Sequence, residues 1–155
     1  MEKYQQHLQD AIKSLKLADH MTYVTFPLIN EYRLLLKIFD EIYKSVINNV
    51  NAVLCYEYLY KRIRLYDNSE DNLQTFSDRC AKNYSLSNEQ IKKILEIIDL
   101  NKKHKKSAME FVKKEKVVIM SEGLGVKTID LYLIKEYLLV AKEFLVCVSK
   151  KVADK

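Results

Sequence analysis

Glycine and proline are nearly absent from this 155-residue chain, which contains two glycines and one proline. Sheets joined by tight turns use many more of both residues, so their scarcity predicts a fold dominated by helices. With 48% hydrophobic and 30% charged residues, the chain has the composition of a globular protein and not of a disordered one. We expect a single domain over residues 1–155.

Paired cysteines are also lacking. The three cysteines, Cys55, Cys80 and Cys147, lie far apart and form no CxxC or Cys/His ligand spacing. They predict buried free thiols in a reducing cytosol. The first 17 residues form a charged amphipathic segment, which differs from a signal peptide. The most apolar late stretch, residues 131–148, contains two lysines and two glutamates, so we expect no membrane span and a cytoplasmic location.

Standard catalytic motifs are missing as well. The two glycines, Gly123 and Gly125, form no glycine-rich phosphate loop. Neither GxSxG nor HExxH occurs, and no Glu-x-x-His pair suggests a di-iron centre. Asp40, Glu41 and Glu57 are single carboxylates on a helical pattern, where we expect solvent exposure. The sequence therefore predicts no catalytic residue, no metal ligand and no cofactor.

A long helical pattern runs from Pro27 to Arg64. Apolar residues recur there at steps of three and four, the period of one helical face. Pro27 suits the first turn of a helix, and Thr25 is a suitable N-cap before it. The pattern predicts one unbroken helix of roughly 50 to 55 Å, at about 1.5 Å per residue. A helix of this length must be covered by others.

Shorter helices are expected around this segment. The patterns predict helices over residues 2–19, from Asn68 or Ser69 to about 82, from 88 to about 103 and from 131 to about 150. We expect a connection over residues 20–26 and the left-handed residue Asn83 after the second of these helices. Ser87 and Gln90 form a capping-box pattern, and Thr128 or Asp130 is expected to cap the last helix.

Residues 107–129 carry the weakest helical signal. Residues 107–116 are ambiguous, and their apolar members fit another helical turn or two. The β-branched runs 117–120 and 126–129, on either side of a glycine-containing loop, indicate either a small hairpin or an extended loop held by apolar anchors. The expected fold is all-α: an antiparallel bundle of four to five helices around one long central helix, with this hairpin before the last helix.

The net charge of +5 arises in one stretch. Between residues 101 and 116, seven lysines and two glutamates give a net charge of +5, and the rest of the chain is balanced. A concentrated basic region indicates an anionic partner, although a solvated lysine-rich face has the same composition. His104 lies among these lysines, either as a phosphate-contacting or acid–base imidazole or as part of a solvated helix end.

Aromatic and basic residues also alternate at the end of the long helical pattern. Tyrosine rings can stack on unpaired bases while arginines hold phosphates, and the same residues are typical of an ordinary helix end. Tyr58 lies off the apolar stripe and is expected to be exposed. The predicted nucleic-acid-binding residues are Lys102, Lys103, His104, Lys105, Lys106, Lys113, Lys114, Lys116, Arg62, Arg64 and Tyr58.

The order of these expected elements resembles the HEPN class of small helical bundles. The segments YEYLYKRIRLYDN and HKKSAMEFVKKEKVVIMSE also look like those of a group of uncharacterised small archaeal proteins. HEPN nucleases carry an arginine followed four to six residues later by a histidine, and no arginine of this chain has a histidine at that offset. The resemblance therefore transfers no catalytic residue. It implies binding of nucleic acid, nucleotides or partner proteins.

The sequence favours a non-enzymatic binding module for RNA or another polyanion. Two alternatives remain at this point. One is a protein-interaction or oligomerisation bundle, such as a homodimer that uses exposed apolar parts of the long helix. The other is a degenerate HEPN-type ribonuclease in which His104 acts.

Overall fold

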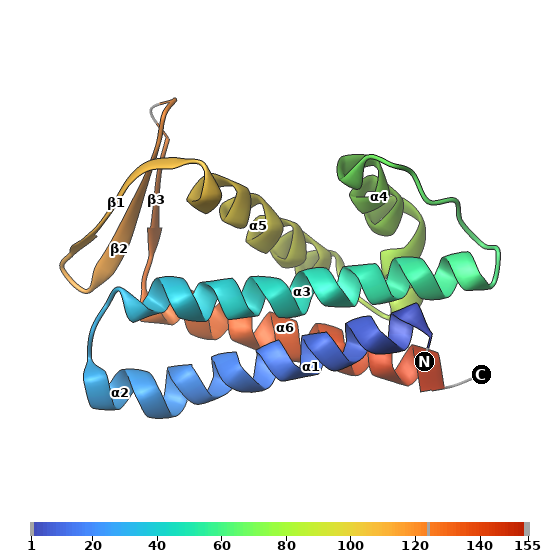
Figure 1. Ribbon diagram of the computed structural model, residues 1–155, viewed down its shortest axis with the longest axis horizontal. Helices are drawn as coiled ribbons and strands as arrows, with labels where there is room; N and C mark the ends of the chain where they lie inside the picture. Colours follow the sequence, from blue (N-terminus) through green and yellow to red (C-terminus); the bar gives the residue numbers. More distant parts are fainter. Residues whose placement is uncertain (1, 124, 154–155) are drawn as a thin grey trace.

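The computed structural model of the protein describes residues 2–123 and 125–153 (Figure 1). The described part is mostly helical, as the scarcity of glycine and proline predicts, and also contains one three-stranded antiparallel sheet. The elements are α1 (Lys3–His20), the π-helical turn η1 (Met21–Thr25), α2 (Phe26–Ile29), α3 (Leu34–Leu59), α4 (Ser69–Thr75), the π-helical turn η2 (Phe76–Cys80), the 3-10 turn η3 (Ala81–Tyr84), α5 (Asn88–Lys105), β1 (Ser107–Lys113), β2 (Lys116–Ser121), β3 (Val126–Ile129) and α6 (Leu131–Ala153).

Helix α3 is the element on which the others pack. Helices α1 and α6 run alongside it, and α5 contacts both α3 and α6 (Figure 1). The buried side chains of α3 follow the predicted period of three and four, as in Leu35, Ile38, Phe39 and Ile42, and they join one hydrophobic core with residues of the other helices. No helix of the described residues is long and apolar enough to cross a membrane.

The long helix is shorter than the sequence predicts. It contains 26 residues, about 39 Å, and begins at Leu34. Pro27 lies in α2, which continues α1 through the π-helical turn η1. The missing N–H of proline is tolerated there because the π turn has already interrupted the α-helical hydrogen-bond ladder. Thr25 has helical dihedral angles and is not an N-cap. The predicted connection over residues 20–26 is also wrong, because these residues are helical throughout.

Asn30 ends this first helical rod. Its φ of 53° is left-handed, and its backbone N–H donates to the Phe26 carbonyl at 2.7 Å. Asparagine tolerates this conformation better than most residues, so the chain turns here and starts α3 four residues later. The predicted unbroken helix from Pro27 to Arg64 is therefore wrong at its start, and it also ends early, at Leu59.

For the segment between α3 and α5, some predictions are confirmed and others are wrong. The Asn68 side chain accepts a hydrogen bond from the Glu70 N–H at 2.7 Å, which confirms it as the N-cap of α4. The predicted helix to residue 82 instead passes through η2 and η3. The left-handed residue that follows is Ser85, with φ of 61°, and not Asn83.

Side-chain caps begin both α5 and α6. The capping box of Ser87 and Gln90 is confirmed at the start of α5. At the start of α6, the Asp130 carboxylate accepts from the Leu133 N–H at 2.8 Å, so Asp130 is the capping residue. The hairpin of β2 and β3 is confirmed, whereas the helical turns considered for residues 107–116 are wrong because β1 pairs with β2, with a register shift between Ser107 and Met109.

Candidate functional site

The sheet has one buried and one uncovered face. Val117, Ile119 and Ile129 are buried against the helical core. Residues paired across antiparallel strands share a face, so the opposite side carries two cross-strand rows. These rows are Met109–Met120–Val126 and Phe111–Val118–Thr128, and we call them the open face. Met109 is 58% exposed and Val126 54% exposed. An apolar surface with one aromatic ring therefore faces outward.

Two lysines lie on this open face, and three others lie in the turn after β1 and at the end of α5. Lys113 and Lys116 are cross-strand partners, two residues beyond Phe111 and Val118, so their side chains leave the sheet on the same side. Lys114 lies in the tight turn between them, with φ of 47°. Lys105 and Lys106 are exposed where α5 leads into β1. None of these five lysines has an ion-pair partner within residues 2–123 and 125–153.

The two lysines further back on α5 are different. Lys102 lies 3.7 Å from the Glu70 carboxylate, and Lys103 lies 3.0 Å from that of Asp99. Asp99, the partner of Lys103, lies near β3, since it lines a hollow together with Val126 and Thr128. The charges of Lys102 and Lys103 are partly neutralised locally, so they contribute less to any attraction near the sheet.

His104 points inward, although the residues on both sides of it are lysines. Its side chain is 12% exposed, with Nε2 3.2 Å from Asp40 Oδ1 and Nδ1 hydrogen-bonded to the Glu110 carboxylate. The imidazole thus joins α5 to α3 and β1. Because both nitrogens face carboxylates, this geometry favours a junction role over phosphate contact or acid–base chemistry. The expectation that Asp40 and Glu41 are solvated is wrong, since Asp40 is half-buried beside the ring and the Glu41 side chain is 17% exposed.

The predicted arginines lie at the other end of the molecule. Asp40, which contacts His104, and Leu59, which ends α3, are about 29 Å apart along the helix axis. Arg62 and Arg64 follow Leu59, whereas the strands lie at the opposite end of α3 (Figure 1). The structure therefore does not bring Arg62, Arg64 and Tyr58 together with the lysines of residues 102–116.

Arg62 is already bound within the chain. Its Nε and Nη2 donate to the two carboxylate oxygens of Glu57 at 3.0 and 2.7 Å, and the Tyr84 hydroxyl donates to Glu57 at 3.0 Å. The guanidinium also lies over the rings of Tyr56 and Tyr60, at 5.7 and 5.1 Å from their centroids. This bidentate, stacked arrangement uses the donors that a phosphate would need.

Glu57 differs most from its predicted environment. It was expected to be solvated, yet it is 4% exposed. Burial by itself would raise the pKa of this carboxyl group, but the hydrogen bonds from Arg62 and Tyr84 and the positive charge of Arg62 outweigh burial and lower the pKa. Burial, followed by the neighbouring Glu57 carboxylate, raises the pKa of the Tyr84 hydroxyl. The sequence signal for this ion pair is an arginine five residues after a glutamate, at the end of a predicted helix.

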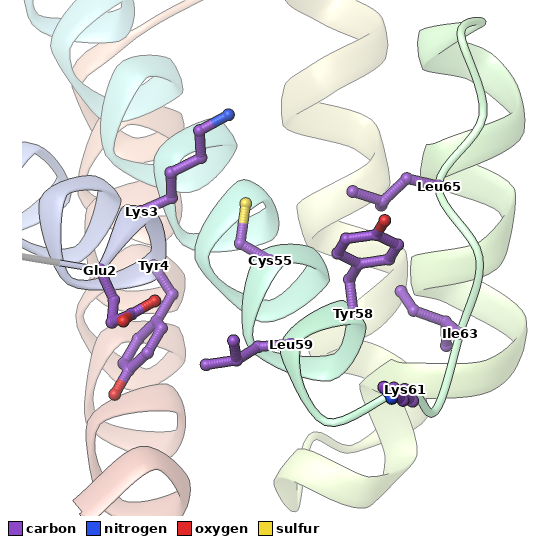
Figure 2. A pocket seen from close by; sticks show the side chains of 9 residues that line it. All are labelled: Glu2, Lys3, Tyr4, Cys55, Tyr58, Leu59, Lys61, Ile63 and Leu65. Carbon is purple, nitrogen blue, oxygen red and sulfur yellow. The ribbon is translucent and has the colours of Figure 1, made fainter.

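Tyr58 is exposed, as predicted, and lines a cavity together with residues from the start of α1 (Figure 2). Arg64, six residues after Tyr58, is exposed, and its guanidinium lies 5.5 Å from the centroid of the Tyr66 ring. Within residues 2–123 and 125–153, no group of three or more His, Cys, Asp or Glu residues is arranged to hold a metal ion.

Comparison with known proteins assigns no family to this chain. No protein-family model matches it, and a search of the curated proteins finds no match. Function must therefore be argued from the geometry of these surfaces.

Proposed function

We propose that the protein binds single-stranded RNA or a similar polyanion on the open face of its sheet. The observation that carries the proposal is the position of the half-buried Phe111 beside Lys113 and Lys116, on the face of the sheet opposite its buried side chains. The residues proposed to contact phosphates are Lys105, Lys106, Lys113, Lys114 and Lys116, and Phe111 is added to them as a stacking residue. Lys102, Lys103, His104, Arg62, Arg64 and Tyr58 are not part of the proposed site.

Two physical interactions support this assignment. Unpaired bases have apolar faces that can stack on Phe111 and cover the exposed methionine and valine side chains of the open face. Phosphates can approach the lysines at the turn and at the start of β1, which have no competing carboxylate partner in the described chain. Lysine binds phosphate as a point charge, so we expect little sequence preference.

The first test is the salt dependence of RNA binding. Fluorescence anisotropy with a labelled oligouridylate should give a Kd that rises steeply with salt, because each phosphate contact releases counterions. Replacing Lys113 and Lys116 by glutamine should reduce the slope of log K against log salt by about 1.4, at about 0.7 per contact. The matched control replaces Lys13 and Lys82, which are exposed on α1 and η3, and should leave the slope unchanged. Equal effects of both double variants would contradict the proposal.

The second test concerns stacking. Phe111→Leu keeps an apolar side chain on the open face but removes the ring, and we expect about tenfold weaker RNA binding, since stacking contributes about 1–3 kcal/mol per base. Phe111→Tyr should restore binding. If leucine, tyrosine and phenylalanine gave the same Kd, aromatic stacking would not be part of the interaction.

The sequence also predicts, as an alternative, a protein-interaction or oligomerisation bundle. The open face supports this alternative as well. Met109, Met120 and Val126 form an exposed apolar row, and β1 is an edge strand that another strand can pair with. Sedimentation at high protein concentration separates the two functions. A dimer that Met109→Lys dissociates, in a protein with no affinity for oligouridylate, would favour the interface between two copies.

A further inference from the structure

A cavity of about 500 Å³ lies at the end of the molecule opposite the sheet, between the start of α1, the last turns of α3 and the loop that follows α3 (Figure 2). Its volume is within the usual range for small-molecule sites. The cavity is distinct from the open face, and its ligand does not depend on the RNA-binding proposal. The lining residues are Glu2, Lys3, Tyr4, Cys55, Tyr58, Leu59, Lys61, Ile63 and Leu65.

Most of the wall is apolar. Ile63 and the Tyr4 ring are buried, whereas Tyr58, Leu59 and Leu65 remain substantially exposed. Large apolar side chains around a concave surface gain free energy when a ligand removes them from water, at about 25 cal/mol per Å². The wall therefore favours a ligand with an apolar body.

The charges at this cavity have an excess of cations. Lys3 belongs to α1 and Lys61 to the loop after α3, and Figure 2 shows them on opposite sides of the apolar residues. Neither lysine has an ion-pair partner in the described part of the chain. Glu2, the one carboxylate of the lining, forms a capping box with Gln5 at the start of α1. An anionic group on a ligand would therefore meet ammonium groups that no protein carboxylate has neutralised.

The loop that forms one wall is held in place by the chain itself. The hydrogen bonds of Arg62 to Glu57, which also accepts from Tyr84, hold the loop at the position between the lining residues Lys61 and Ile63. Lys61 has a left-handed φ of 60°, an uncommon conformation for a residue other than glycine or asparagine. A wall that is already ordered reduces the entropy lost when a ligand binds.

We infer that this cavity binds a small amphipathic carboxylate in solution, with an alkyl or aryl body against Tyr58, Leu59 and Leu65 and a carboxylate near Lys3 or Lys61. A neutral apolar molecule would fill the wall but would leave both ammonium groups without a partner. A polyanion would place several charges against an apolar wall at a desolvation cost. One anionic group on an apolar body matches both features.

Decanoate is a suitable probe, and 1-decanol is its uncharged counterpart. Isothermal titration should show saturable binding of decanoate to the full chain at concentrations below its micelle formation, and weaker binding of decanol. Cys55 provides an independent report because its thiol lines the cavity and is partly exposed. Decanoate should slow the reaction of Cys55 with a maleimide at least threefold, as measured by peptide mapping, and should leave the reaction of the partly exposed Cys147 on α6 unchanged.

Charge variants test the role of the lysines. Lys61→Asn removes the charge while keeping a residue that tolerates the left-handed conformation, and Lys3→Gln removes the other charge. Each should weaken decanoate binding about two- to fivefold, the range for exposed ion pairs. Lys82→Asn, an exposed lysine on η3, is the control and should have no effect.

Several outcomes would overturn the inference. They are absence of saturable decanoate binding, equal affinity for decanol, unchanged labelling of Cys55, or equal effects of Lys61→Asn and Lys82→Asn. An acyl chain in a membrane has the same chemistry as a dissolved fatty acid. Protection of Cys55 by phosphatidylglycerol vesicles but not by free decanoate would assign the cavity to a lipid surface and contradict a soluble ligand. A failure of RNA binding leaves all of these results unaffected.

Discussion

Glu57 is the residue whose environment has the clearest consequence for stability. It is a buried carboxylate that accepts hydrogen bonds from Arg62 and Tyr84 and so ties the loop after α3 to η3. A buried carboxylate without such partners would be costly, so the three side chains form a unit. The stability of this unit depends on the charge of Glu57 and therefore on pH.

We expect Glu57→Gln to lower the free energy of unfolding at pH 7 by about 1–3 kcal/mol, less than for a fully buried pair because Arg62 is half exposed. The pKa of Glu57 is lower in the folded state, so the unfolded state binds the proton more readily. The contribution is present above the ordinary glutamate pKa of about 4.3 and is lost as pH falls through the lower folded value. Urea unfolding at several pH values measures this loss.

The difference between wild type and Glu57→Gln should therefore shrink on acidification. Glu122→Gln changes an exposed glutamate and should give no comparable difference at any pH. A wild-type advantage that grew as the pH fell would show that the charge of Glu57 does not stabilise the fold.

At the scale of the elements, the ends of the helical segments determine how the helices are arranged. The first helical segment runs from Lys3 to Ile29, because Pro27 in α2 follows the π-helical turn η1 and its missing N–H is tolerated there. The segment ends because Asn30 adopts a left-handed conformation. The turn at Asn30 determines where α3 begins and therefore where its buried side chains lie in the core. The helix end at Asn30 is thus a specific feature of this sequence.

Asn30→Ala should destabilise the protein by about 1 kcal/mol, because a Cβ without a polar group disfavours the left-handed region. Asn30→Gly should remain within about 0.5 kcal/mol of wild type, since glycine adopts this conformation freely. Thermal and urea unfolding measure both variants. Equal destabilisation by alanine and glycine would indicate that the Asn30 side chain matters by its contacts and not by its backbone conformation.

At the scale of the whole molecule, the sheet lies near the start of α3 (Figure 1), whereas the cavity is lined by residues from the last turns of α3. His104 connects the sheet end to the helices through Asp40 on α3 and Glu110 on β1. Two half-buried carboxylates would face each other without the imidazole between them. We therefore expect this junction to control how firmly the strands are held.

His104→Leu should reduce overall stability by about 1–3 kcal/mol, because it leaves the polar groups of Asp40 and Glu110 without their partner. Hydrogen exchange should increase mainly in β1 and the last turn of α5, and much less at the start of α5. His20→Leu, an exposed histidine at the end of α1, is the matched control. Uniformly faster exchange in every element would mean that His104 supports the core as a whole and not this junction.

Some features could be predicted from the sequence because their causes are local. The capping box of Ser87 and Gln90 involves neighbours three residues apart, and the β-branched runs of β2 and β3 flank a glycine-containing turn. Strand β1 could not be predicted in this way. Its apolar residues fit a helical period as well as an alternating one, and its pairing with β2 decides between them.

The separation of the basic residues has the same kind of explanation. In the sequence, Arg62 and the lysines of residues 102–116 are equally plausible members of one patch. The direction of α3 and the return of α5 along it place them at opposite ends of the molecule. Only packing determines which end of a helix faces which neighbour.

A chain with two glycines and one proline was bound to be mostly helical, because few of its residues favour the turns that sheets require. Its apolar stripes, its single basic stretch and the caps formed by Asn68 and by Ser87 with Gln90 follow from the order of the residues alone. The burial of Glu57 beside Arg62, the inward direction of His104 and the cavity between α1 and the end of α3 exist only in the folded chain. Each depends on residues that are distant in sequence and meet because the helices pack, and no local pattern records that meeting.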